Sequence, residues 1–370
     1  MLPRHYRPSS VPLCGRPYDI IHKIFSVFIY SPSPGNKSGI NMEQQVTNDL
    51  KSRFFTRQNN RYMIKSALIP LTPALLKPRY WSAWIIVLLM WSLAWLPVKT
   101  KHAMGARLGR VLSKRMKSRT RISRRNLSVC FPDKSPAEIE TLIEENMVEM
   151  TKGALEASHP WWRDMSGYSA KAKVIGLDKL FNAHAKGNGV LIMGGHFAAV
   201  DFILAIFADR VARDYPLGYM YRPHDNPVIN RMIVNGRHRH HVHGFTKYEL
   251  KDMVQFLKDG GMAWYGCDQN FSKSDLFAPF FGVQAANLST PTWIVQESGA
   301  AVVFMRMHRL ADGNFEYEFS DELEGFGNDA QQDCEAWNRE LEKAILHYPA
   351  QYFWVHKRFK KRPAGEAGMY

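Results

Sequence analysis

From about residue 171 onward, short apolar runs alternate with longer segments in which apolar residues recur every three or four positions. The short runs are typical of buried strands, and the longer segments are typical of amphipathic helices. Elements that alternate in this way form a sheet with helices on its faces. For residues 171–363 we therefore predict an α/β domain with a central, mostly parallel or mixed sheet flanked by helices. The expected strands are 189–195, 217–222, 261–268, 300–310 and 315–323, and the expected helices are 178–187, 196–212, 226–237, 248–260, 290–300 and 333–359.

An uncharged run of 19 residues, from Tyr80 to Val98, precedes this domain. At about 1.5 Å of rise per residue, a helix of that length crosses the hydrocarbon core of a bilayer. Lysine and arginine flank the run on both sides, as expected for residues that anchor a membrane helix at the two interfaces. We expect a transmembrane helix over 80–98, and a buried core helix is the alternative. More basic residues follow the run than precede it, which favours a single-pass protein with a cytoplasmic C-terminal part.

Residues 99–170 are predicted to form basic and then acidic amphipathic helices. Residues 99–125 contain eleven lysines and arginines and no acidic residue, while Leu108, Val111 and Leu112 keep helical spacing. We expect a helix that lies on an anionic membrane surface, and a solvated charged face is the alternative. An acidic helix follows, and Ser135 and Glu138 have the spacing of a capping box at its start.

The whole chain carries a formal net charge of +15, from 49 basic and 34 acidic side chains. This excess suits an anionic partner, and because no nucleic-acid-binding motif is present, a membrane surface or an acidic protein is favoured over nucleic acid. The four cysteines are scattered and match no metal-binding or disulfide pattern. The histidine-rich stretch 238–243 has no acid or cysteine nearby to complete a metal shell, so we interpret it as a polar surface loop. Residues 1–63 are expected to be a poorly ordered extension, with Met42 or Met63 as alternative starts.

The stretch GGHFAAVD places two ionisable side chains among apolar residues. His196 follows the expected strand 189–195, and Asp201 lies five positions later in the expected helix. A carboxylate bonded to one imidazole nitrogen fixes the tautomer, and the other nitrogen can then take a proton from a hydroxyl. Gly194 and Gly195 permit a tight turn and a close approach of backbone N–H groups to a substrate. The pair is a candidate general base with its orienting acid, and a core histidine paired with a nearby acid is the alternative.

Several motifs, in this order along the chain, resemble those of the late acyltransferases of lipid A biosynthesis. These enzymes form the lauroyl and myristoyl transfer group of the lysophospholipid acyltransferase superfamily. The resemblance runs from about Ala74 to Pro363 and rests on ALLKPRYW, RNLSVCFPDKS, GGHFAAVD, YRPHDNPVIN, WYGCDQNF, FAPFFGVQAA and QYFWVHKRFKKRP. It implies a glycerolipid-acyltransferase-like fold. It also implies a place in the cell inner membrane, with the catalytic domain on the cytoplasmic side.

The resemblance implies a role for each matching residue. His196 is the expected general base and Asp201 its orienting carboxylate, although the family usually has glutamate at this position and the glycerol-lipid acyltransferases usually have aspartate. Arg222 in YRP resembles an arginine near the family's active site, where a guanidinium binds phosphate or carboxylate. Asp268 in CDQN resembles a second acid of the family, and it is expected to bind substrate, as are Gly194, Gly195 and Arg222. A strand-end salt bridge is the alternative for Arg222, and a turn-forming residue is the alternative for Asp268.

The implied reaction transfers an acyl chain from the thioester of acyl carrier protein to a hydroxyl of a 3-hydroxyacyl chain on a lipid A precursor of the Kdo-lipid IVA type. It requires no metal, cofactor or covalent enzyme intermediate. The expected partners are the acidic carrier protein, a membrane-embedded glycolipid and the anionic membrane surface, and the basic stretch 356–362 is expected to dock one of the two substrates. A solvated basic tail is the alternative for that stretch. Two other functions remain open: a lysophospholipid acyltransferase acting on a glycerol lipid, which the lack of an EGTR-type motif disfavours, and a non-catalytic membrane-anchored homologue.

Overall fold

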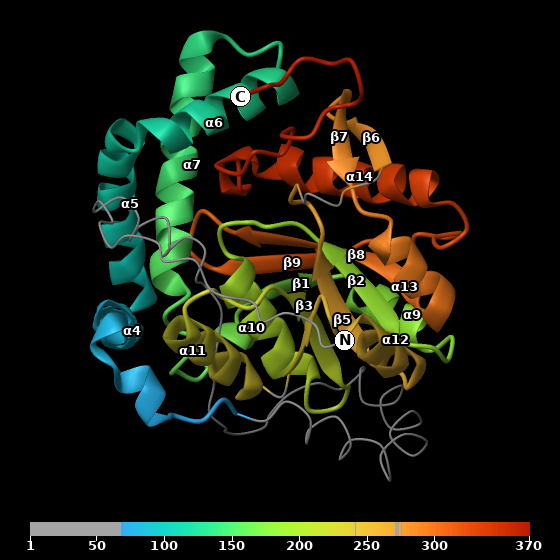
Figure 1. Cartoon of the computed structure of the whole chain (residues 1–370), viewed down its shortest axis with the longest axis horizontal. Coiled ribbons are helices and arrows are strands. Elements are labelled where there is room, and N and C mark those ends of the chain that lie inside the picture. Colours follow the sequence, from blue (N-terminus) through green and yellow to red (C-terminus); the bar gives the residue numbers. More distant parts are fainter. Residues whose placement is uncertain (1–67, 241, 271–273, 275) are drawn as a thin grey trace, which may run out of the picture.

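A computed structural model describes residues 68–240, 242–270, 274 and 276–370. The extension predicted over 1–63 lies outside the described residues. Within them, the chain forms a group of helices in its first part and a sheet covered by helices in its second part (Figure 1).

The central sheet has seven strands in the described part of the chain, in the order β1-β9-β8-β2-β5-β3-β4. Every neighbouring pair is parallel except β8 and β9, which are antiparallel. This confirms the predicted mostly parallel or mixed sheet flanked by helices. The strands are β1 (Lys173–Ile175), β2 (Val190–Gly194), β3 (Leu217–Tyr221), β4 (Val242–Thr246), β5 (Met262–Gly266), β8 (Ala301–Arg309) and β9 (Phe315–Phe319), and β6 (Leu276–Phe280) pairs with β7 (Val283–Asn287) in a separate hairpin.

Helices cover both faces of this sheet because its strands are apolar on both sides. On β2, Ile192 belongs to one core and Leu191 to the other, since successive strand residues point to opposite faces. The first core includes residues of α10 and α11, and the second includes residues of α12, α13 and α14. Figure 1 shows α14 and the β6–β7 hairpin on the opposite side of the sheet from α10. The helices are α9 (Leu177–His184), α10 (Val200–Val211), α11 (Pro227–His238), α12 (Leu250–Lys258), α13 (Thr290–Ser298) and α14 (Ala330–His347).

The uncharged run 80–98 does not form one continuous helix. The 3-10 turns η1 (Pro73–Leu76) and η2 (Pro78–Tyr80) lead into α4 (Trp81–Ala94), a helix of 14 residues, and α5 (Val98–Arg115) begins after Pro97. Proline has no backbone N–H and cannot continue the preceding helix, so Pro97 separates α4 from α5. In the portion of the chain that the structure describes, no helix is both long and apolar enough to cross a membrane. The expected helix over 80–98 is therefore wrong in its extent.

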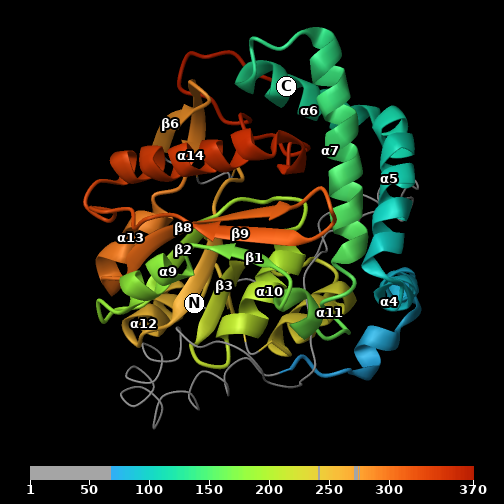
Figure 2. The same ribbon diagram turned by 180° about the vertical axis from the view of Figure 1, so that it is seen from behind.

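Helices α5 and α7 (Pro136–Glu156) lie side by side in both Figure 1 and Figure 2. Two glycines of α5 allow this close contact. A Cβ atom on Gly105 would come within 2.7 Å of the Cα of Lys152, and one on Gly109 within 2.5 Å of the Cα of Val148. The predicted capping box is confirmed at the start of α7, where Ser135 and Glu138 bond reciprocally. Helix α6 (Lys117–Cys130) connects the two.

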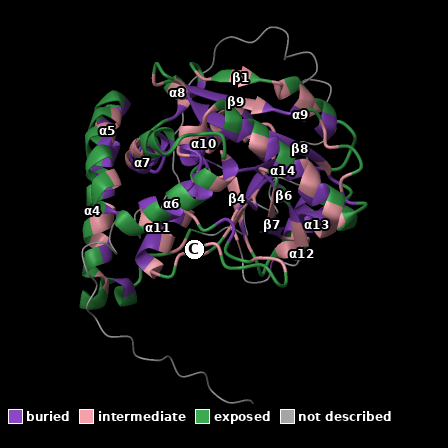
Figure 3. Ribbon diagram, turned by 90° about the horizontal axis from the view of Figure 1, so that it is seen from above, coloured by how far each residue is buried: buried purple, intermediate pink, exposed green. Residues whose placement is uncertain are grey.

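Large apolar side chains of α4 and α5 remain exposed. Seen from above in Figure 3, the two helices lie at one edge of the molecule and carry exposed residues along their outer sides. We call this surface the α4–α5 apolar face. Its residues are Trp81, Ile85, Leu88, Leu89, Trp91, Trp95, Met104, Leu108 and Val111, each at least 39% exposed.

Candidate active site

His196 stands in the loop between β2 and α10, two residues after the last residue of the strand. The segment 351–353 near the end of the chain holds this loop through backbone contacts. The N–H of Phe353 donates to the carbonyl of His196 at 3.0 Å, and the N–H of Ala198 donates to the carbonyl of Gln351 at 2.7 Å. Helix α7 supports it from another side, because Gly153 lies directly against the carbonyl of Ala198. The position of His196 is therefore set by two distant parts of the chain, the segment 351–353 and helix α7.

The side chain of His196 is paired with Asp268. Its Nδ1 lies 2.5 Å from Oδ1 of Asp268, and its backbone N–H donates to Oδ2 of the same carboxylate at 2.9 Å. The sheet explains this meeting. Strands β2 and β5 are parallel neighbours with Gly194 opposite Gly266, so the second residue after each strand reaches the same edge. The His196 side chain is 32% exposed and that of Asp268 only 2%, so the ring is open to a substrate while its partner is not.

The electrostatics of this pair favour a base with a fixed tautomer. Burial lowers the pKa of His196, but the charge of Asp268 and the hydrogen bond to it outweigh burial, and the pKa is raised. Burial raises the pKa of Asp268, yet the His196 ring and backbone N–H hold it at about 2. Because the ionised carboxylate can only accept, Nδ1 carries the hydrogen and Nε2 keeps its lone pair. Nε2 is the atom that can take a proton from a substrate.

Asp201 does not orient His196, which corrects the expectation drawn from the sequence. It lies in the first turn of α10, is 5% exposed, and its Oδ1 has no hydrogen-bond partner among the described residues. Burial raises the pKa of Asp201 well above its usual value, and the positive charge of Arg237 only partly offsets this. The carboxyl of Asp201 is thus buried on α10 within electrostatic reach of Arg237. The Nδ1 of His196 bonds Asp268 instead.

Gly194 and Gly195 make room for neighbouring side chains. A Cβ on Gly194 would lie 2.5 Å from Nε1 of Trp264, and one on Gly195 would lie 2.5 Å from a methyl of Leu341. The indole of Trp264 in turn packs edge-on against His196, with ring centroids 6.0 Å apart. The first glycine therefore lets the indole lie beside the catalytic candidate. The expected binding of substrate by the backbone N–H groups of Gly194 and Gly195 stays a prediction.

Arg222 is not part of the buried site. It follows β3, its side chain is 76% exposed, and it pairs with the exposed Asp225 at 3.1 Å. Of the two interpretations of its sequence context, the surface salt bridge at the end of a strand describes this geometry. Its predicted binding of a substrate anion stays untested.

The sequence analysis missed three residues at the end of the chain that surround the pair. His356 accepts a hydrogen bond from the N–H of Asn270 at 2.8 Å, and burial lowers its pKa to about 4, so it is neutral. Burial and the charge of Asp268 raise the pKa of Tyr352. The guanidinium of Arg358, 1% exposed, bonds Asn287 at 2.8 Å and helps to hold Asp268 ionised. The motif QYFWVH was the available signal, because its aromatic residues come directly before a basic run, where an exposed tail would be polar.

Part of the basic stretch 356–362 has a structural role, and its expected docking of a substrate stays a prediction. The side chain of Arg358 is inside the protein, and two other basic side chains of the stretch, Lys361 and Arg362, bond the carbonyls of Ser274 and Gln284. The stretch therefore fastens the end of the chain to the β6–β7 region.

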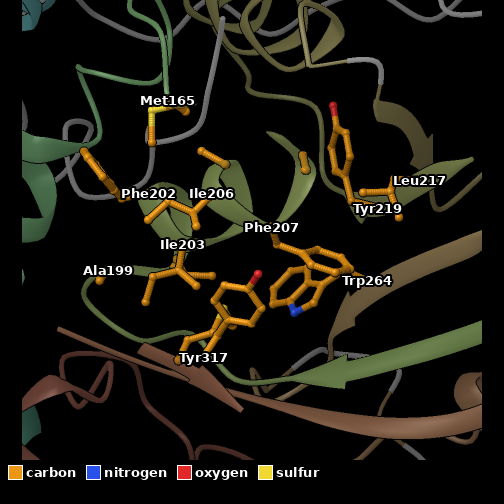
Figure 4. Close-up of a cluster of buried hydrophobic side chains, with 14 of the residues drawn as sticks. Met165, Ala199, Phe202, Ile203, Ile206, Phe207, Leu217, Tyr219, Trp264 and Tyr317 are labelled. Carbon is orange, nitrogen blue, oxygen red and sulfur yellow. The ribbon is translucent and has the colours of Figure 1, made fainter. Parts of the chain in front are cut away.

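An apolar pocket of about 500 Å³, open space at its mouth included, lies on the α10 side of the sheet. Figure 4 shows Phe207 and Trp264 side by side in this region, with Leu217 and Tyr219 on the neighbouring strand. The lining residues are Ile192, Leu204, Phe207, Ala208, Leu217, Gly218, Tyr219, Arg237, Val242, Met262 and Trp264. Trp264 thus contacts both His196 and the pocket.

The histidine-rich stretch is not a surface loop. His238 ends α11, His240 is 4% exposed, and His243 lies on β4 with its ring 4.4 Å from that of Phe245. His241 lies outside the described residues. Across the part of the chain with described coordinates, no group of three or more histidine, cysteine or acidic side chains is arranged to hold a metal ion.

The sequence matches a family model and several known proteins. Residues 69–361 match the family model of the bacterial lipid A biosynthesis acyltransferases. The lipid A biosynthesis palmitoleoyltransferase of Escherichia coli is 33% identical over 299 residues, which cover 80% of this chain and 96% of that protein. The lauroyltransferase of the same organism is 32% identical and covers 80% and 97%, and the myristoyltransferase is 26% identical and covers 79% and 91%.

The fold presents a histidine–carboxylate pair at the carboxyl edge of its strands, and the family model and the relatives place the chain in the class of bacterial acyltransferases. The chain belongs to the bacterial lipid A biosynthesis acyltransferase family and is an O-acyltransferase of lipid A biosynthesis.

Proposed function

We propose that the protein transfers an acyl chain from acyl carrier protein to a hydroxyl of a 3-hydroxyacyl chain on a lipid A precursor of the Kdo-lipid IVA type. The observation that carries the proposal is the hydrogen bond between Nδ1 of His196 and Oδ1 of Asp268, with the ring partly exposed. Family membership supports a lipid A-type glycolipid as the acceptor. A net charge of +15 favours an acidic carrier protein as the donor.

The mechanism begins with the acceptor hydroxyl near Nε2 of His196. Nε2 takes the hydroxyl proton while the oxygen attacks the thioester carbonyl, and Asp268 stabilises the imidazolium that forms. When the carbon–sulfur bond breaks, the imidazolium returns the proton to the leaving thiolate. The products are an acyloxyacyl ester and the free thiol of the carrier, so every proton and electron pair is accounted for without a covalent enzyme intermediate.

The apolar pocket supplies space for the acyl chain in this proposal. It is lined almost entirely by carbon, and one of its lining residues, Trp264, also packs against His196. A chain in the pocket would present its thioester near the imidazole, and desolvation of the chain would favour binding by roughly 0.8 kcal/mol per buried methylene.

The α4–α5 apolar face supports association with a membrane surface, where the acceptor resides. Tryptophan is enriched at membrane interfaces, and this face contains Trp81, Trp91 and Trp95. The adjoining helices α5 and α6 are rich in lysine and arginine, which attract anionic lipid headgroups. We place the protein at the cell inner membrane, with this face against the cytoplasmic leaflet.

An assay with two acceptors tests the proposal. Purified protein in mixed micelles receives acyl carrier protein thioester, with either a tetraacylated lipid A precursor or a lysophospholipid as the acceptor. We expect transfer to the lipid A precursor. Transfer to the lysophospholipid alone would contradict the proposal and favour the glycerol-lipid alternative. The glycerol-lipid acyltransferases usually have aspartate at the position of Asp201. Absence of transfer to both, with His196→Ala unchanged from wild type, would favour the non-catalytic alternative.

A further inference from the structure

Among the described residues that line the apolar pocket, Arg237 is the one that carries a charge. It lies near the end of α11 and is 7% exposed. Its guanidinium carbon is 3.9 Å from the centre of the Tyr219 ring and 5.4 Å from that of Tyr221. These aromatic contacts hold the guanidinium against β3, beside Trp264 on the next strand.

Two nitrogens of Arg237, Nε and Nη1, have no hydrogen-bond partner among the described residues. Nε1 of Trp264, another lining residue, also has none there. Leaving a buried donor unpaired destabilises the fold, and more so when the donor is charged. The pocket wall therefore holds unpaired N–H donors and a positive charge, which together suit an oxygen that carries negative charge.

The charge of Arg237 is felt at both candidate groups of the active site. It lowers the pKa of His196, where the charge of Asp268 has a larger, raising effect. It also lowers the pKa of Asp201, which burial raises more strongly. The guanidinium thus lies within electrostatic reach of the base. Asp201 does not neutralise it, because burial keeps the pKa of that carboxyl well above its usual value.

We propose that Arg237 is a further catalytic residue, whose free N–H groups bind the carbonyl oxygen of the acyl donor and hold the negative charge that develops there. The inference rests on the proposed function. When the acceptor oxygen attacks, the carbonyl electron pair moves to this oxygen while the proton goes to His196. The pair returns to carbon as the carbon–sulfur bond breaks, and Arg237 stays protonated throughout.

Steady-state kinetics of Arg237→Gln provide the first test. Removing one donor to an oxyanion typically costs about 10²–10³ in kcat. We expect a loss of that size with a smaller change in KM. The acidic limb of the pH profile should also move to higher pH, because the variant removes a charge that lowers the pKa of His196. Arg239→Gln is the matched control, because Arg239 is exposed and lies two residues further along the chain. This variant should behave as wild type.

A binding measurement separates this inference from the proposed function. Calorimetry with dodecanoate and dodecanol, which share an alkyl chain, reports the oxygen contact without any turnover. Wild type should bind dodecanoate more tightly, and Arg237→Gln should lose that preference. A preference that survives the substitution, or a kcat within twofold of wild type, would overturn the role of Arg237. If wild type transferred no acyl chain but showed the arginine-dependent preference, the proposed function would fail and the carboxylate site would stand.

Arg237→Lys keeps the test decisive if the glutamine variant does not fold. Lysine retains the charge but has a different donor geometry. We expect the dodecanoate preference to remain and kcat to fall about tenfold or more. An unchanged kcat would contradict the proposal.

Discussion

The Nδ1 of His196 lies 2.5 Å from Oδ1 of Asp268, although the two residues are 72 positions apart in the sequence. The contact exists because β2 and β5 are parallel neighbours in the sheet. It assigns the orienting role to a residue that the sequence suggested only as a substrate-binding acid. Replacing Asp268 and replacing Asp201 should therefore have different effects on the pH dependence of the reaction.

Asp268→Asn should shift the pH profile of acyl transfer downward. The base must be neutral, so activity falls as the pH drops through the pKa of His196, which Asp268 raises. Without the carboxylate, burial lowers this pKa, and the acidic limb moves to lower pH. The plateau rate should fall by about 10²–10⁴-fold because the tautomer is no longer fixed. Rates measured from pH 5 to 9 at saturating substrate check this.

Asp201→Asn is the contrasting variant for that experiment. The groups that shift the pKa of His196 do not include Asp201. The midpoint of the acidic limb should therefore be the same in this variant as in wild type, even if the plateau rate changes. A downward shift in this variant, with none in Asp268→Asn, would reverse the two assignments.

Gly194→Ala should damage the site through Trp264. The new methyl would lie 2.5 Å from Nε1 of the indole, so the indole must move, and it packs against His196. Overpacking of this kind typically costs about 1–3 kcal/mol. We expect a lower free energy of unfolding and slower transfer. Gly167→Ala, where a Cβ would meet no atom within 4 Å, is the control, and equal losses in both variants would exclude this explanation.

Removing apolar side chains from the α4–α5 apolar face should weaken membrane binding. In the triple variant Trp81→Ser, Ile85→Ser and Leu88→Ser, we expect at least a tenfold lower affinity for vesicles of phosphatidylethanolamine and phosphatidylglycerol, since each buried side chain contributes up to about 1.5–3 kcal/mol. The binding that remains should decrease with added salt. Leu346→Ser, 60% exposed in wild type on α14, serves as the control. Equal co-sedimentation of both variants would argue against this face.

Lys101→Met should stabilise the fold. Lys101 is fully buried on α5, its Nζ has no hydrogen-bond partner among the described residues, and burial lowers its pKa to about 7. Because the unfolded lysine binds its proton more tightly, wild type loses stability as the pH falls from about 10.5 to 7. Replacing a buried charge by an apolar residue gains roughly 1–4 kcal/mol.

The gain from Lys101→Met should be largest at or below pH 7 and should shrink as the pH rises toward 10.5. Urea unfolding at pH 6.5 and 9.5 measures this difference. A destabilised variant at pH 6.5 would show that the ammonium is neutralised by Glu156, whose charge raises the pKa of Lys101.

Local patterns predicted most of the fold. The apolar runs placed β2, β3, β5, β8 and β9, and the spacing of Ser135 and Glu138 placed the start of α7. Helix ends were less predictable: α14 ends at His347 rather than at 359, because the chain turns at Pro349. The run 80–98 has the composition of a membrane span, but Pro97 ends it as a helix.

The candidate site was harder to predict, because its contacts connect distant segments. The motif indicated His196 as the candidate base and suggested Asp201 as its partner. Only the strand order, with β5 next to β2, brings Asp268 to the ring. Arg358 shows the same difficulty, since a basic stretch at the end of a chain indicates an exposed tail, whereas this side chain is held by Asn287 inside the protein. Arg237 gave no signal in the sequence.

Transfer of a labelled acyl chain to the lipid A precursor, followed by mass spectrometry of the glycolipid for wild type and His196→Ala, tests the central claim most directly. The account predicts that wild type adds one ester-linked chain to a 3-hydroxyacyl group. It also predicts that the variant, folded and binding membranes normally, is slower by at least about 10³-fold. A variant that acylates the precursor at the wild-type rate would contradict the claim that this imidazole is the base.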